Sequence, residues 1–127
     1  MELVAIISML VLIQYVIQGL RVGQARGRYG VEAPATTGHP VFERHFRVHQ
    51  NTLEQLAVFL PALWLCAAYA STRLAAVLGL GFIVARFLYE RGYVEDPKKR
   101  STGATLTAVV IVLLLLAGLI GAVVKLF

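Results

Sequence analysis

The sequence predicts an all-α integral membrane protein, a bundle of four transmembrane helices. Of its 127 residues, 58% are hydrophobic, and the mean hydropathy is +0.74. A soluble domain of this size would not carry so much apolar sequence. Four apolar stretches each approach or exceed the roughly 20 residues that a membrane crossing needs. Because they nearly exhaust the chain, we expect a single membrane domain over residues 1–127.

The four helices can be placed from the apolar runs and from the residues that interrupt them. We expect them at residues 3–24, 41–69, 74–92 and 101–125. A loop rich in glycine and proline follows the first helix, and Pro61 should kink the second. Only a short turn near Ser71 separates the second helix from the third, so these two should be antiparallel. Ser101 or Thr102 is the expected N-terminal cap of the fourth.

The basic residues indicate how the chain is oriented in the membrane. The net charge is +5, and ten of the twelve lysines and arginines fall in two blocks, residues 21–47 and 86–100. The positive-inside rule therefore predicts cytoplasmic first and third loops, with both termini on the opposite side. This topology explains the charge without a nucleic-acid partner. Nine arginines against three lysines point to a GC-rich bacterial genome, and so to a bacterial inner membrane.

A polar cluster, FERHFRVHQNTLE at residues 42–54, opens the second apolar segment. Arg47, Asn51 and Glu54 are spaced i, i+4 and i+7, so on a helix they share one face. An ionisable side chain at membrane depth costs about 2.5–3.5 kcal/mol, so such residues usually line a site or a polar seam. Both signs of charge and an amide together favour a small zwitterionic ligand.

Further polar residues lie at the same ends of the other helices. Arg86, Tyr89 and Tyr93 are spaced to share a face of the third helix, while Arg26 ends the first and Arg100 begins the fourth. Taken singly, such residues have an ordinary explanation, because arginines snorkel and tyrosines favour membrane interfaces. Of the three histidines, His45 and His49 are four apart and could face one way, but no third ligand is obvious. We therefore expect no metal site.

Three motifs together resemble one protein family. RVHQNTLE at 47–54, ARFLYERGY at 85–93 and TTGHPVFER at 36–44 are similar to motifs of the membrane-associated proteins in eicosanoid and glutathione metabolism (MAPEG), in the microsomal glutathione S-transferase branch. The resemblance covers essentially the whole chain. It implies a homotrimer of four-helix subunits, with glutathione bound between neighbouring subunits near the cytoplasmic face. The motif glutamate is followed here by Gln55 where the family often has an aromatic residue, and proline comes only at Pro61.

The resemblance also implies roles for particular residues. The glutathione contacts would be Arg26, Arg47, His49, Gln50, Asn51, Glu54, Arg86, Tyr89 and Tyr93. Arg100 matches the arginine that activates the thiol, with Ser101 beside it. The chemistry is consistent, because arginines recognise carboxylates in a bidentate way and Glu54 can pair with the ammonium group. A guanidinium near the sulfur favours the thiolate, as at reactive cysteines.

These expectations describe a membrane glutathione transferase or peroxidase. Glutathione is its co-substrate, and a lipophilic second substrate arrives from the bilayer lipid. Three alternatives stay open: a glutathione-dependent isomerase of the same family, a non-catalytic lipid-binding scaffold, and a small multidrug exporter. The exporter would use Glu54 to bind cations, which the nearby arginines oppose.

Overall fold

The computed structural model describes residues 1–127 and consists of four long helices without strands. The helices are α1 (Glu2–Tyr29), α2 (Pro40–Tyr69), α3 (Thr72–Glu95) and α4 (Ser101–Leu126), with a short 3-10 helix, η1 (Pro97–Arg100), before α4. Counting η1 with α4, all four are long and apolar enough to cross a membrane. The predicted four-helix membrane fold is therefore confirmed.

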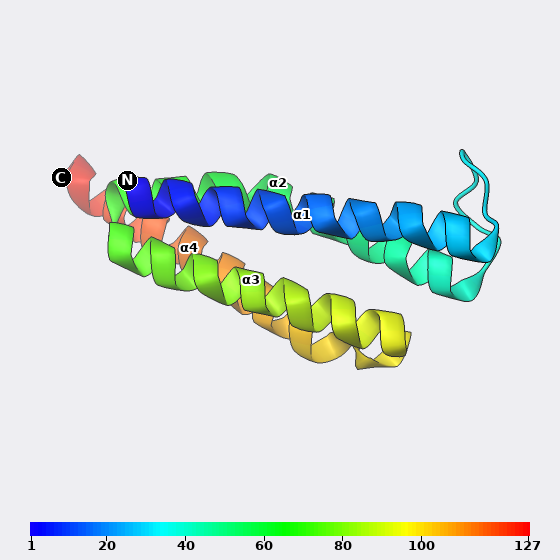
Figure 1. Ribbon diagram of the computed structural model, residues 1–127. Coiled ribbons are helices and arrows are strands. Elements are labelled where there is room, and N and C mark those ends of the chain that lie inside the picture. Colours follow the sequence, from blue (N-terminus) through cyan, green and yellow to red (C-terminus); the bar gives the residue numbers. More distant parts are fainter.

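The two termini lie together at one end of the bundle (Figure 1). The α1–α2 loop and the α3–α4 connection lie at the other end, which we call the basic end because it carries residues 21–47 and 86–100. Figure 1 also shows that the α1–α2 pair and the α3–α4 pair separate toward this end. Which side of the membrane the basic end faces stays a prediction.

Helices α1 and α3 continue beyond their expected ends, to Tyr29 and Glu95, and the cap of α4 also differs. Helix α1 continues to Tyr29 and stops at Gly30, whose φ of 69° lets its N–H bond back to the Arg26 carbonyl. The expected capping of α4 by Ser101 or Thr102 is wrong. Its N-cap is Arg100, without a side-chain bond, because η1 leads directly into the helix.

The apolar core lies where all four helices are close together. Phe59 of α2 stacks on Phe82 of α3 with 3.7 Å between ring centroids, and Leu114 of α4 is fully buried in the same cluster. Nearer the basic end, Gly103 permits a close crossing of α3 and α4, since a Cβ there would overlap the backbone of Tyr89. This crossing brings α4 against the polar residues of α3.

Candidate functional site

A buried arginine joins three helices at the basic half of the bundle. Arg86 of α3 is only 1% exposed. Its Nη2 donates to Asn51 Oδ1 at 2.8 Å and to Thr52 Oγ1 at 2.9 Å, both on α2. Its Nη1 donates to Thr107 Oγ1 of α4 at 3.4 Å. The guanidinium therefore has a fixed position set by neutral acceptors.

The two threonines are themselves oriented as acceptors. Thr52 donates its hydroxyl proton to the Val48 carbonyl at 2.8 Å, and Thr107 donates to the Gly103 carbonyl at 2.7 Å. Such i−4 bonds to the helix backbone use the only proton that a hydroxyl carries. The oxygen lone pairs are left to accept from Arg86.

A hollow of about 220 Å³ lies against this arginine, between α2, α3 and α4. We call it the polar hollow; its lining is Asn51, Gln55, Arg86, Tyr89, Arg100, Ala104, Thr107 and Ala108. The Arg86 guanidinium lies 4.3 Å from the centre of the Tyr89 ring, and Tyr89 stacks on Tyr93 at 5.6 Å. Arg100 is anchored by a 2.7 Å bond from Nη1 to the Pro97 carbonyl.

The polar hollow carries positive charge without a counter-ion. Neither Arg86 nor Arg100 forms an ion pair with a carboxylate. The Nε of Arg86 is buried and has no hydrogen-bond partner. A buried charge is normally paired, because burying it alone is costly. The hollow is therefore suited to an anionic ligand.

The structure brings four of the predicted site residues together around the polar hollow. These are Asn51, Arg86, Tyr89 and Arg100, with Tyr93 stacked just outside. Thr52 and Thr107 are not among the residues predicted from the sequence. Neither has a signal in the sequence, because they meet Arg86 only through the packing of α2 and α4 against α3.

The other predicted residues lie outside the polar hollow. Arg26 donates to the Ala35 carbonyl at 2.7 Å, and His49 stacks on Tyr15 of α1 at 4.3 Å, so both belong to the α1–α2 side. Three more, Arg47, Gln50 and Glu54, are exposed on α2. Ser101 lines a different hollow with Thr102 and Thr105. One chain alone therefore does not assemble the whole predicted set.

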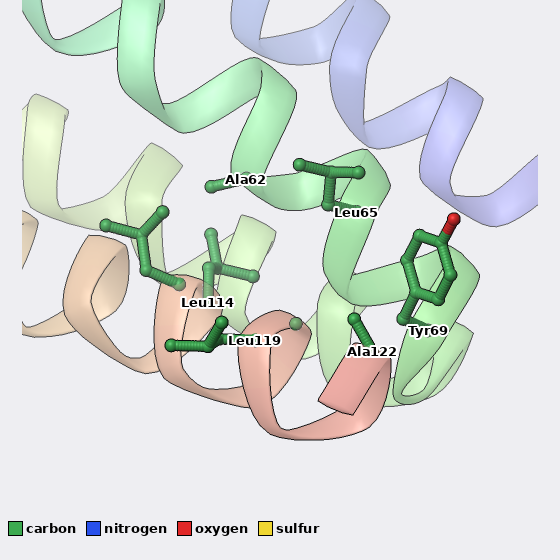
Figure 2. Close-up of a pocket in the computed structure, with 8 residues that line it drawn as sticks. Ala62, Leu65, Tyr69, Leu114, Leu119 and Ala122 are labelled. Atoms are coloured by element: carbon green, nitrogen blue, oxygen red, sulfur yellow. The ribbon is translucent and has the colours of Figure 1, made fainter. Parts of the chain in front are cut away.

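An apolar hollow of about 360 Å³ continues along α2 and α4 toward the termini (Figure 2). Its lining includes Ala62, Leu65, Tyr69, Leu114, Leu119 and Ala122. Gln55 and Ala62 are seven residues apart on α2, and Ala108 and Leu115 are seven apart on α4, so the two hollows follow the same faces of both helices. Seven residues of helix span about 10 Å, so on α2 this separates the nearest lining residues of the two hollows.

The sequence is similar to known membrane proteins. Residues 4–120 match the MAPEG family. The chain is 43% identical to microsomal glutathione S-transferase 2 of Homo sapiens over 94% of this chain and 81% of that protein. It is 44% identical to an uncharacterised protein of Synechocystis sp., over 91% of this chain and 85% of the relative. Leukotriene C4 synthase of Mus musculus is 34% identical over 78% of this chain and 68% of its own length.

Proposed function

The chain belongs to the MAPEG family, and from this premise we propose that it is a membrane enzyme with glutathione as its co-substrate. It activates the glutathione thiol for attack on lipophilic electrophiles or hydroperoxides. The relatives named for glutathione transfer and for leukotriene C4 synthesis support this class of activity.

The observation that carries the proposal is the unpaired charge of Arg86 and Arg100 at the polar hollow. Glutathione has two carboxylates, an ammonium group and a thiol. A carboxylate at Arg86 would supply the missing counter-charge and an acceptor for the free Nε. Asn51 serves the peptide groups, and the Tyr89 hydroxyl adds a polar contact.

Arg100 is the residue that activates the thiol in this account. A free thiol titrates near pH 8.5, so about 3% of it is thiolate at pH 7. A guanidinium beside the sulfur favours the charged form and lowers that pKa. The proton leaves to solvent. In conjugation the thiolate sulfur then forms a bond to the electrophilic carbon, and the leaving group departs with the electron pair.

The remaining predicted contacts require a neighbouring subunit, which we propose is supplied by a homotrimer. Arg47 and Glu54 are exposed on α2, and Arg26 lies on the α1–α2 side. In a monomer these charges would face lipid, which is unfavourable. With a second copy packed beside α2, these side chains would face glutathione bound between the subunits instead of lipid. Glu54 would then pair with the ammonium group.

The second substrate is apolar and comes from the bilayer. The apolar hollow of Figure 2 supports this, because it continues along the same helix faces as the polar hollow. With a hydroperoxide instead of an electrophile, two glutathione molecules are oxidised to the disulfide, and the hydroperoxide is reduced to an alcohol and water. An isomerase would return glutathione unchanged.

The proposal can be tested by incubating purified protein in detergent with glutathione and a second, apolar substrate, either an electrophile or a hydroperoxide. Loss of free thiol with formation of a thioether indicates the transferase, and formation of glutathione disulfide indicates the peroxidase. Binding of glutathione without turnover of either would favour the lipid-binding scaffold. Failure to bind glutathione, with proton-coupled export of cations from vesicles, would establish the exporter instead.

A further inference from the structure

A second polar region lies at the basic end, between α1, α2 and α3. Two adjoining hollows of about 260 and 440 Å³ share Arg21 and His45 in their linings. The first also includes Arg28, and the second includes Phe87, Glu90 and Arg91. None of these residues lines the polar hollow. The region is therefore separate from the proposed glutathione site.

This region has an excess of positive charge. Arg21 of α1 pairs with the largely buried Glu90 of α3, so these two charges cancel. Glu95, which also lines the larger hollow, pairs with Lys99 at 2.7 Å. No carboxylate pairs with Arg28 or Arg91. Two guanidiniums are therefore left to bind an anion.

An exposed apolar surface extends from these arginines toward the middle of the membrane. On α3, the residues leading up to Arg91 at spacings of three or four are all exposed; they are Val77, Leu80, Val84 and Phe87. On α1, Leu10, Ile13 and Ile17 lead up to Arg21 at the same spacings and are also exposed. Helices α1 and α3 are in contact. The basic region thus lies at one end of a strip of exposed apolar residues on the adjoining helices α1 and α3.

We propose that this region binds an anionic phospholipid of the leaflet that the basic end faces. The anionic headgroup binds at Arg28 and Arg91, which line the two adjoining hollows, and the acyl chains lie along the exposed strip. Basic pockets between membrane helices bind anionic headgroups in this way. The strip favours a lipid over a free anion, because a soluble phosphate gains nothing from apolar surface. The site is independent of the proposed glutathione chemistry.

Native mass spectrometry of the full chain in detergent can measure the retention of phosphatidylglycerol against phosphatidylcholine. We expect phosphatidylglycerol to be retained selectively. The double variant Arg28→Gln/Arg91→Gln should weaken its binding by about 10- to 30-fold, without changing phosphatidylcholine retention or glutathione turnover. Arg21 is left in place, because its removal would strand the buried Glu90 carboxylate.

The matched control, Arg73→Gln/Lys125→Gln, removes the same charge from the end with the termini and should leave phosphatidylglycerol retention unchanged. An equal loss in both double variants would overturn the proposal, since it would indicate diffuse attraction. A third measurement adds inorganic phosphate as a competitor of the bound phosphatidylglycerol. If it displaces the lipid completely, the region binds a free anion and not a phospholipid.

Discussion

The guanidinium of Arg86 donates to Asn51 Oδ1 at 2.8 Å and so ties α3 to α2 at the polar hollow. All of its protein partners are neutral. Arg21 provides the contrast, because Glu90 cancels its charge. Arg86 is thus held in position by neutral oxygens while its charge remains available to a ligand.

The first prediction concerns the acceptors that hold Arg86. Thr107→Val keeps the side-chain shape but removes the oxygen that accepts from Nη1. Losing a bond to a charged group costs about 1.5–3 kcal/mol. Most of this cost falls on the folded protein itself, with or without ligand, so we expect glutathione binding to weaken through poorer positioning of Arg86, by up to about 10-fold, measured by calorimetry on the purified protein.

Thr105→Val is the control for this change, because Thr105 is exposed on another face of α4. It should bind glutathione as the unmodified protein does. Equal affinity in the Thr107 and Thr105 variants would show that Arg86 needs no support from α4.

The second prediction concerns the close crossing of α3 and α4. In Gly103→Ala the added Cβ would overlap the Tyr89 backbone, so the helices must move apart. Overpacking of this kind costs about 1–3 kcal/mol, and we expect a lower thermal unfolding midpoint in detergent. Gly23→Ala in α1 is the control. No atom lies within 4 Å of its new Cβ, so it should unfold no earlier. A stable Gly103→Ala protein would contradict the close crossing.

The sequence predicted the spans well, because long apolar runs bounded by charge leave few alternatives. The grouping of Arg86, Tyr89 and Tyr93 on α3 agrees with their contacts, since helical spacing is local information. Of the group predicted on α2, only Asn51 lines the polar hollow. Contacts between helices could not be predicted from spacing. The Arg21–Glu90 pair and the bond from Arg86 to Thr107 depend on the register of separate helices, which packing at Gly103 helps to set.

The third prediction separates the enzyme from the exporter. Glu54 is exposed and has no protein partner, so Glu54→Gln should not affect folding. If Glu54 pairs with the ammonium group of glutathione, the change weakens binding by about 1.5–3 kcal/mol. Glu32→Gln, in the α1–α2 loop, is the control and should have no effect. Unchanged affinity with loss of proton-coupled export would assign Glu54 to the exporter.

The fourth prediction concerns topology. Because the basic end carries ten of the twelve lysines and arginines, it should face the cytoplasm, with both termini on the opposite side. Alkaline phosphatase fused at either terminus should be active, and a cytoplasmic fluorescent reporter there should be dark. The reverse pattern at both termini would show that the orientation is inverted.

The thiolate itself gives the most direct test of the central claim, that Arg100 activates bound glutathione. Titrating the protein with glutathione at neutral pH should produce the ultraviolet absorbance of a thiolate. In Arg100→Leu this absorbance should appear only at a pH higher by about 1–3 units, while glutathione still binds. Turnover should be low at neutral pH and recover in part as the pH rises. Arg100→Lys should restore the signal only partly, because lysine lacks the planar guanidinium. Thiolate absorbance and activity that are unchanged in Arg100→Leu would contradict the mechanism.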